Sequence, residues 1–411
     1  MRICIVTAAG HGIGGMQDHT RTLAKALIEA GHDVEVVTTR HPEGLLEERR
    51  HGAHWHYLDA AHRHPWLPRR DPAWLRRSWE AFLALQRERP FDVIHSESSS
   101  AIGLVRRRIH RRVPLVVEWH GSTISLVRAA LARARSGDIR AKLRETKGLV
   151  WLAGEYFQHG HWYRFHPCVW IVPSRYEFEN VRRDGFVKRS LGHVVPNGVD
   201  VSVFRPRPQQ EARDELGLTT GRLFVCAGRL NYEKGMHHAI RALSELRNGD
   251  HTPAAKLIVV GEGEERGPLK RLARSLGVER CVVFAGAQSH EVLATYLAAG
   301  DVFVFPTERA EAAPLILPQA MACGAAVVAS DIGGITEVVG TTGENGLLVP
   351  PGDVAALTRA MRVLSCSERH RHLLGEAAQR RVLAEYTVER MVESTLEAYR
   401  HAIALAGRTS I

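Results

Sequence analysis

The stretch CIVTAAGHGIGGMQDHT, Cys4–Thr20, joins a short apolar run to a glycine-rich loop and then to a helix-like segment. Gly10, Gly12 and Gly15 have the spacing G-x-G-x-x-G of a dinucleotide-binding strand–loop–helix unit. Glycine permits a sharp turn and a close approach of the backbone to a ligand, and a helix N-terminus attracts anions. The stretch therefore predicts a parallel α/β fold with a phosphate or a sugar near this loop. A tight turn without a ligand is the alternative.

A NAD site of this type also needs an acidic residue at the end of the second strand, where it binds the ribose hydroxyls. The second apolar run, DVEVVTTR, ends instead in Thr38, Thr39 and Arg40, and its Glu35 lies near its start. Arg40 is compatible with a 2′-phosphate. An NAD(P)-dependent oxidoreductase therefore stays as an alternative function.

Short apolar runs alternate with helix-like segments along the whole chain and form two series. Most are continuously apolar and β-branched, which is typical of parallel strands covered on both faces. The runs are Ile3–Thr7, Val34–Thr39, Phe91–His95, Pro114–Glu118, Val169–Pro173 and His193–Val195, and then Leu223–Ala227, Lys256–Val260, Val282–Ala285, Val302–Phe305, Ala325–Ala329 and Gly346–Val349.

The chain has 411 residues, and single cores stop growing near ~250–300 residues. We therefore predict two Rossmann-like, doubly wound parallel-sheet domains, residues 1–200 and 201–383, divided near the proline-rich PNGVDVSVFRPRPQQ. The remaining segment, residues 384–411, predicts an amphipathic helix. Its apolar positions have helical spacing: Val388, Met391, Val392, Leu396, Tyr399 and Ile403.

The formal net charge of +10 favours anionic partners such as nucleotide phosphates or a membrane surface. The chain shows no nucleic-acid-binding module, so we expect no nucleic-acid partner. None of the six cysteines forms a C-x-x-C pair, which predicts free thiols in a reducing compartment. The chain starts with a strand rather than a signal peptide, so we expect a cytoplasmic protein. His54-Trp-His56 and His159-Gly-His161 lack further ligands, so we expect no metal site.

A second phosphate site is predicted by VCAGRLNYEKG, which places Arg229 directly after a strand and Lys234 just before a probable helix. Ligands of open α/β sheets bind at the carboxyl ends of strands, and two cations at one such edge suit a diphosphate. Glu311 follows another strand, and a carboxylate beside helix N–H groups can bind sugar hydroxyls. Solvated surface charges are the alternative for these residues.

Several motifs, in this order over both domains, resemble the retaining nucleotide-sugar glycosyltransferases of family 4, also called group 1. The resemblance implies the GT-B fold, whose two Rossmann-like domains face each other across a cleft that holds the donor. It also implies transfer of a hexose-type sugar to an acceptor hydroxyl without a metal cofactor. The motifs are GIGGMQDH, EWHG, VPSRYE, VPNGVD, GRLNYEKG, VVGEGEE, DVFVFPT, EAAPLILPQAMACG, ASDIGGITEVV and NGLLVPPGD.

The resemblance implies donor-binding roles for two glycines and two cationic residues of these motifs. Gly14 and Gly15 would face the diphosphate or the transferred sugar, and Arg229 and Lys234 would bind the diphosphate and stabilise the departing negative charge. The domain 1–200 would be the acceptor side and 201–383 the donor side, with the C-terminal helix crossing back onto the first domain.

The resemblance also implies contacts to the sugar. Glu311 would bind the hydroxyls of the donor sugar together with the backbone N–H groups of Ala313 and Leu315. His120, in EWHG, resembles the active-site histidine of the family, and His19 resembles a residue on the acceptor side.

One position departs from the family pattern of two glutamates separated by seven residues. Glu311 matches the first, but Gln319 stands where the second glutamate binds the ribose hydroxyls. An amide can still accept and donate hydrogen bonds, so we expect weaker nucleotide binding. A catalytically inactive sugar-nucleotide-binding subunit is therefore an alternative.

The acceptor should be set by Gly121–Cys168, and a sugar, a lipid-linked glycan and a small molecule are all compatible with the sequence. The arginines of this stretch either lie against an anionic membrane surface, making the protein peripheral, or form a solvated helix face. Its aromatic side chains either stack on the acceptor or pack in a core: Trp151, Tyr156, Trp162 and Tyr163.

Overall fold

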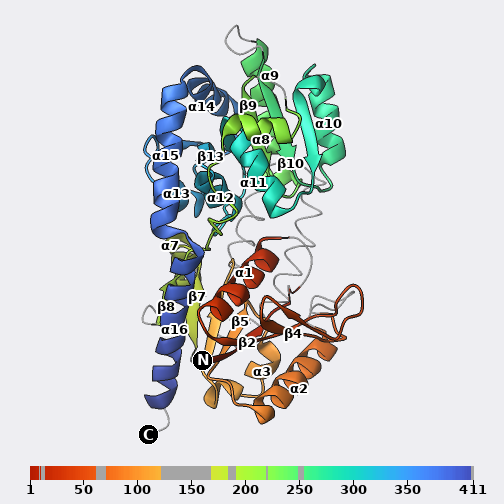
Figure 1. The fold of residues 1–411 in the computed structure, drawn as a ribbon, viewed down its shortest axis with the longest axis vertical. Helices are drawn as coiled ribbons and strands as arrows, with labels where there is room; N and C mark the ends of the chain where they lie inside the picture. The colour runs from red at the N-terminus through yellow and green to blue at the C-terminus, as the bar shows by residue number, and fades with distance from the viewer. Residues whose placement is uncertain are drawn as a thin grey trace. The chain divides into compact units, whose positions relative to one another are not determined.

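The computed structural model describes residues 1–8, 10, 14–61, 71–121, 168–183, 191–218, 221–248 and 254–408. The chain forms two compact units (Figure 1). Unit 1 comprises Met1–Gly198 and Val388–Ile411, and unit 2 comprises Val199–Thr387. The assignment of the acceptor to the first unit and of the donor to the second stays a prediction.

Unit 1 is built on an eight-stranded sheet with the strand order β3-β4-β2-β1-β5-β6-β7-β8. All its pairs are parallel except β3 with β4. The strands are β1 (Arg2–Val6), β2 (Asp33–Thr38), β3 (Glu47–Arg50), β4 (Ala53–Tyr57), β5 (Val93–Glu97), β6 (Leu115–Glu118), β7 (Val169–Val172) and β8 (Gly192–Val194).

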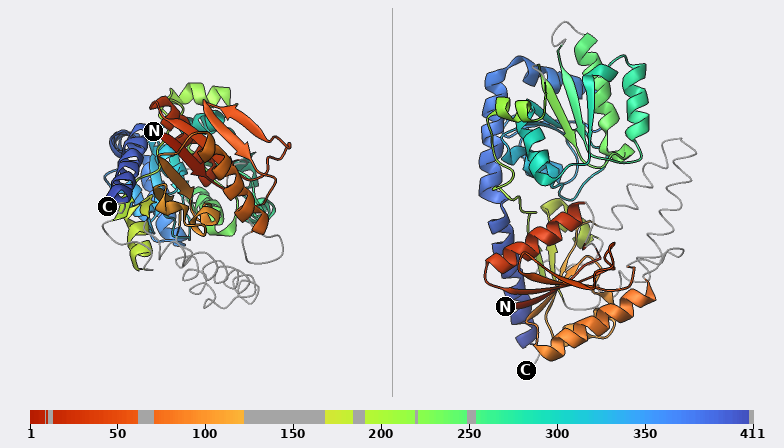
Figure 2. Two further views of the ribbon diagram at one scale, coloured as in Figure 1. Left: turned by 90° about the horizontal axis from the view of Figure 1, so that it is seen from below. Right: turned by 45° about the vertical axis from the view of Figure 1, so that its right-hand side comes forward.

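Helices cover both faces of this sheet (Figure 2). Apolar residues of α1 (Gly15–Glu29) and α16 (Val388–Arg408) form one core with Ile3, Val93 and Val116. Those of α2 (Pro72–Glu88), α3 (Ile102–Val105) and α7 (Arg175–Arg183) form another core against the opposite face. Both faces are thus buried, which explains the continuously apolar strands.

The edge of this sheet differs from the sequence-based expectation, which contained neither β3 nor β4. The β3 sequence EERR is wholly polar, and it pairs antiparallel at the edge of the sheet. In β4, AHWHY, buried residues alternate with partly exposed ones. A search for continuous apolar runs does not detect strands with either pattern.

Unit 2 is built on a six-stranded, all-parallel sheet with the order β11-β10-β9-β12-β13-β14. Its helices form two apolar cores with alternate residues of the strands. The strands are β9 (Leu223–Ala227), β10 (Lys256–Val260), β11 (Val282–Gly286), β12 (Val302–Phe305), β13 (Ala326–Ser330) and β14 (Leu347–Val349). The helices of eight or more residues are α9 (Met236–Asn248), α10 (Arg266–Ser275), α11 (His290–Ala299), α14 (Val354–Cys366) and α15 (Glu368–Glu385), and the shorter ones are α8 (Gln209–Glu215), α12 (Ile316–Ala322) and α13 (Ile335–Val339).

The C-terminal segment is interrupted where the chain returns from unit 2 to unit 1. Helix α15 ends at Glu385, and Thr387 forms a parallel bridge with Val199 before α16 begins at Val388. The apolar residues of α16 share a core with strands of the first sheet.

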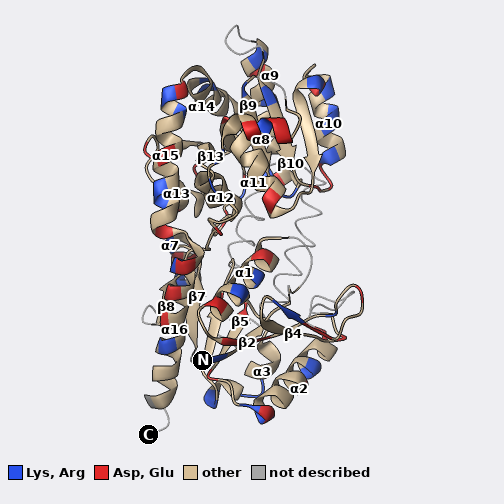
Figure 3. Ribbon diagram, in the orientation of Figure 1, with Lys and Arg blue, Asp and Glu red and all other residues tan. Residues whose placement is uncertain are grey.

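Many of the charged residues belong to the helices (Figure 3). The basic residues Lys270, Arg271 and Arg274 of α10 are exposed, opposite its buried Leu269 and Ala273. All six cysteines are free thiols, as predicted. Among the described residues, no helix combines the length and the apolar character that crossing a bilayer requires.

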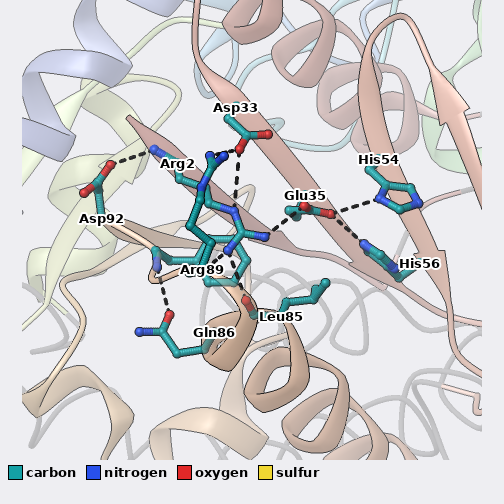
Figure 4. Close-up of polar contacts among 10 residues, drawn as sticks. Arg2, Asp33, Glu35, His54, His56, Leu85, Gln86, Arg89 and Asp92 are labelled. Carbon is teal, nitrogen blue, oxygen red and sulfur yellow. Dashed lines mark hydrogen bonds and ion pairs between the residues drawn. The ribbon is translucent and has the colours of Figure 1, made fainter.

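A polar network ties β1 to β2 and to the end of α2 (Figure 4). The guanidinium of Arg2 donates to Oε1 of Glu35 at 3.0 Å and to the carbonyl of Leu85 at 3.0 Å. It also lies 4.2 Å from the centre of the Phe91 ring. Asp33, the first residue of β2, forms ion pairs with this guanidinium and with Arg89.

The second carboxylate oxygen of Glu35 binds the two histidines of β4. Oε2 lies 2.6 Å from Nε2 of His56 and 3.4 Å from Nδ1 of His54. Burial opposes ionisation of Glu35, but hydrogen bonds from His56 and Arg2 outweigh it and lower its pKa to about 2. The ion pair therefore persists well into the acid range.

We expect Glu35→Gln to lower stability near neutral pH by about 1–3 kcal/mol, because Arg2 loses its buried anionic partner. A carboxylate with a depressed pKa adds stability above its ordinary pKa of 4.5, and this contribution disappears as the pH falls towards 2. Thermal unfolding should therefore show a gap between wild type and variant that narrows below about pH 4.5. A gap that is independent of pH would contradict this origin.

Candidate functional site

In unit 2, the loop that follows β9 is shaped by close contacts between backbones. Gly228 has a φ of 140°, and a Cβ on Gly261 would lie 2.0 Å from its carbonyl oxygen. A Cβ on Gly263 would lie 2.2 Å from the carbonyl oxygen of Leu230. The glycines of VVGEGEE are thus required for the β9 and β10 loops to pack together.

Lys234 lies at the end of a 3₁₀ turn (Tyr232–Lys234), which the Asn231 side chain caps by accepting from Lys234 N at 3.2 Å. The next residue, Gly235, has a φ of 70°, and a Cβ there would lie 1.9 Å from the carbonyl oxygen of Pro306. This contact brings the turn against the end of β12. The ammonium group of Lys234 donates to Oε1 of Glu311 at 2.7 Å.

The loop that carries Glu311 is held by the next strand exit, DIGG. Gly334 N donates to the carbonyl of Glu311 at 2.8 Å, and a Cβ on Gly334 would lie 1.9 Å from the carbonyl oxygen of Ala312. Gly333 has a φ of 64°, and a Cβ there would lie 2.8 Å from the carbonyl oxygen of Glu311. Both glycines therefore fix the position of Glu311.

The remaining candidates of unit 2 surround this pair. Arg229 is exposed, and its side chain has no hydrogen-bond or ion-pair partner within the part of the chain that the structure describes. Leu315 is the N-cap residue of α12, whose Gln319 is buried. Ala313 lies between Glu311 and this helix. The arrangement offers a free guanidinium, an ammonium–carboxylate pair and a helix start at one edge of the sheet, a combination that suits an anionic, hydroxyl-rich ligand.

In unit 1, the candidate residues belong to a buried polar cluster on β5 and β6. Glu97 and Glu118 are paired across these parallel strands. Since side chains alternate between the two faces of a strand, His95 lies on the same face as Glu97, and His120 on the same face as Glu118. The core residues Val93 and Val116 show that this is the face covered by α1 and α16.

Short contacts join the cluster. Nε2 of His120 forms a hydrogen bond with Oε2 of Glu97, and Nε2 of His19 lies 2.9 Å from Oε1 of Glu118. Nε2 of His95 lies 3.3 Å from Oε2 of Glu118 and 3.6 Å from Oε1 of Glu97.

Two side chains from helices complete the cluster. The Thr20 hydroxyl of α1 donates to Oε1 of Glu97 at 3.1 Å, and the hydroxyl of Tyr399 of α16 lies 3.0 Å from Nδ1 of His95. The cluster thus connects both helices on this face to the carboxyl ends of β5 and β6.

The histidines and carboxylates of the cluster stabilise each other's charged forms. Burial opposes charge on every member, yet the two carboxylates raise the pKa of His95 to about 9 and also raise that of His19. The histidines in turn lower the pKa of Glu118 to about 2 and hold that of Glu97 well below its ordinary value. The two buried carboxylates are thereby kept ionised, Glu97 chiefly by His120 and Glu118 chiefly by His19.

The glycine-rich loop leads into this cluster. Gly14 is the N-cap residue of α1 and Gly15 its first residue, one turn before His19. A Cβ on Gly10 would lie 2.4 Å from Oγ1 of Thr38, so the first motif glycine is needed for packing on the end of β2. Gly12 lies outside the described residues, as does 122–167 of the expected acceptor region.

The structure therefore brings His19 and His120 together in unit 1, and Lys234 and Glu311 together in unit 2. Sequence reasoning missed Glu97, Glu118, His95 and Tyr399. The available signal was the pair of alternating motifs His95-x-Glu97 and Glu118-x-His120, each at the end of an apolar strand.

Among the described residues, four groups of three His or Glu side chains are close enough to share a metal ion. Two belong to the cluster of unit 1, and a third is the Glu35 group in Figure 4. The fourth lies beside Lys234, where His237 and His238 bind Glu308 and lower its pKa to about 2. All four are joined internally by hydrogen bonds or ion pairs, and the expectation of no metal stays a prediction.

Two family models match the chain. The model described as Glycosyltransferase Family 4 matches residues 13–203, and the model described as Glycosyl transferases group 1 matches residues 208–381. The D-inositol 3-phosphate glycosyltransferase of Acidothermus cellulolyticus is 30% identical over 411 residues, which span 95% of this chain and 86% of the relative.

Solved structures show the same fold. Sucrose-phosphate synthase from Thermosynechococcus elongatus has a TM-score of 0.78 at 24% identity, with 98% of this chain and 99% of that chain covered. Anabaena Alr3699/HepE, solved in complex with UDP-glucose, has a TM-score of 0.72 at 20% identity, with 98% and 100% covered.

These findings replace the alternative of an oxidoreductase. The glycine-rich loop, the two doubly wound sheets and full-length similarity to a glycosyltransferase agree with one another. The chain has the GT-B fold and belongs to the group 1, or family 4, retaining glycosyltransferases, enzymes that transfer a hexose from a nucleotide sugar to an acceptor.

Proposed function

We propose that Arg229, Lys234 and Glu311 bind the nucleotide-sugar donor of this hexosyltransferase. The observation that carries the proposal is the hydrogen bond between Lys234 and Glu311, which joins the exits of β9 and β12. An ammonium group has three donors, and Glu311 uses one of them. The others are available for the diphosphate, while the exposed Arg229 supplies a second cation.

The same cations have a catalytic role in this proposal. When the sugar–phosphate bond breaks, negative charge builds up on the leaving nucleoside diphosphate. Fixed positive groups at that position stabilise the transition state more than the ground state, which lowers the barrier. Arg229 and Lys234 then supply the charge that a divalent metal ion supplies in other enzymes.

Sugar contacts are assigned to the Glu311 loop and to unit 1. Glu311 accepts from hydroxyls of the donor sugar, aided by the backbone N–H groups of Ala313 and Leu315. Gly14 and Gly15, at the start of α1, are assigned to the diphosphate or the transferred sugar. His120 acts near the reacting face of the sugar.

His19 is the least direct of these candidates. It was expected on the acceptor side, but it is buried and lies against Glu118 and the His120 ring. We therefore propose that His19 supports His120 beside the acceptor.

The acceptor class and the cellular site are the open parts of the function. We propose a cytoplasmic reaction, which the free thiols support. A lipid-linked acceptor would bring the enzyme to a membrane surface, whereas a soluble sugar or small molecule would not. Flotation with anionic vesicles, with and without a candidate lipid acceptor, separates these cases.

The donor can be identified by thermal shift with UDP-, GDP-, ADP- and TDP-hexoses, since a ligand that binds the folded state raises the melting temperature. The UDP-glucose complex of Anabaena Alr3699/HepE makes UDP-glucose the first to test. With the best donor, we expect Lys234→Ala and Arg229→Ala each to reduce transfer by at least about tenfold to a hundredfold, because a charged hydrogen bond contributes ~1.5–3 kcal/mol.

Arg271→Ala is the matched control for these two variants, since it removes an exposed cation of the same unit on the outer face of α10. It should transfer sugar like the wild type. Unchanged turnover in the Lys234 or the Arg229 variant would refute the assignment.

Gln319→Glu should tighten nucleotide binding by about tenfold, because a carboxylate accepts two ribose hydroxyls and charged hydrogen bonds are about twice as strong as neutral ones. Gln319→Leu, which removes the polar group at the same buried position, should weaken binding. Calorimetry with the nucleoside diphosphate measures both. Equal affinities of wild type and both variants would remove Gln319 from the ribose site.

Gly334→Ala should weaken donor binding without unfolding unit 2, since the new Cβ would collide with the Ala312 carbonyl and displace the Glu311 loop. Gly267→Ala is the control: it lies in α10, where a Cβ meets no atom closer than 3.5 Å. Donor titrations measure the affinity of both variants. Equal affinities would contradict the prediction that the position of the Glu311 loop determines donor binding.

A further inference from the structure

We propose that Glu97 is a positioning residue for His120: its carboxylate binds Nε2 of the ring and leaves Nδ1 as the atom that faces the substrate. This inference rests on the proposed function, in which His120 acts beside the donor sugar. It assigns a role to a residue that neither the glycine loop nor the strand-exit motifs indicated.

Each carboxylate oxygen of Glu97 has its own hydrogen-bond partner. Its side chain is fully buried, and Oε1 receives the hydroxyl of Thr20, one turn after the start of α1. The other oxygen, Oε2, is directed at His120. A carboxylate fixed in this way at both oxygens holds one tautomer and one direction of the imidazole ring.

His120 is the exposed end of the cluster. Its side chain is 14% exposed, against 2% for His19 and none for His95. A ligand can therefore reach His120, whereas the other two histidines contact protein. The His19 ring stands T-shaped to the His120 ring, with the centroids 4.9 Å apart, and restricts its rotation.

The charges of the cluster favour the contact between Glu97 and His120. A buried carboxylate pair without cations would carry a large desolvation cost. His19 and His95 supply that compensation, as the direction of their pKa shifts shows. His120 takes part in this compensation as well: among the histidines it does most to hold the pKa of Glu97 below its ordinary value, whereas His19 does most for Glu118. The contact that orients the His120 ring therefore also stabilises the charge of Glu97.

Helix α16 takes part in this arrangement. The Tyr399 hydroxyl lies 3.0 Å from Nδ1 of His95, and burial beside Glu118 and Glu97 raises the pKa of Tyr399, which keeps the hydroxyl neutral. The hydrogen bond fixes the far side of His95, so that Nε2 faces the carboxylates. The C-terminal segment therefore anchors the cluster that positions His120.

The test is nitrogen NMR of the full-length protein labelled with ¹⁵N-histidine. In the neutral ring of the wild type we expect the proton of His120 on Nε2 and a bare Nδ1, because the Glu97 carboxylate accepts from Nε2. In Glu97→Gln we expect this tautomer preference to be lost, because an amide at this position can donate to Nε2 as well as accept from it. His120→Gln identifies the resonance.

Two variants separate positioning from general damage. Glu97→Asp keeps the carboxylate and should restore most of the tautomer preference, and it also serves if Glu97→Gln fails to fold. Tyr399→Phe removes only the hydroxyl that reaches His95 and should leave the tautomer of His120 unchanged. An unchanged tautomer in Glu97→Gln would overturn the proposal.

Turnover adds an independent readout. With the donor found by thermal shift, Glu97→Gln should lower kcat, and Glu97→Asp should restore most of it. If His120→Gln retains full transfer while the tautomer of His120 still changes in Glu97→Gln, positioning by Glu97 holds and the catalytic role of His120 is refuted. The two proposals therefore fail in distinguishable ways.

Discussion

Parallel strands have their carboxyl ends at one edge of the sheet, and the candidate residues of each unit depend on this constraint. In unit 1, the pairing of Glu97 with Glu118 places two carboxylates side by side where β5 and β6 end. In unit 2, the exits of β9 and β12 bring Lys234 to Glu311, 77 residues further along the chain. Without the parallel register, neither group would form.

Glycines at the strand exits of unit 2 fix the positions of the loops that carry Lys234 and Glu311. Gly235 and Gly334 each lie where a Cβ would come within 1.9 Å of a carbonyl oxygen. The backbones of neighbouring loops are therefore in direct contact, and Lys234 and Glu311 emerge from loops that support each other. Any other residue at these positions would separate the loops and displace the charged side chains.

The sequence predicted the features that have a local signal: the buried parallel strands, the two domains and the charged residues at strand exits. It did not predict β3 or β4, because EERR has no apolar residue and AHWHY alternates. Nor did it predict Glu97, since the role proposed for this residue depends on contacts with Thr20 of α1 and with His120, which follows β6. Those contacts follow from strand order and register, which distant parts of the chain determine.

The two units use charge in opposite ways. In unit 1, the buried carboxylates of Glu97 and Glu118 are balanced by the histidines beside them, of which His120 has the most accessible side chain. In unit 2, Lys234 is paired with Glu311, but the guanidinium of Arg229 is left exposed and without an anion among the described residues. In the proposed site, a diphosphate would supply the missing negative charge, and the sugar would receive the hydrogen bonds of Glu311. An activated sugar carries both groups, so the proposal assigns a nucleotide sugar to this edge rather than either part alone.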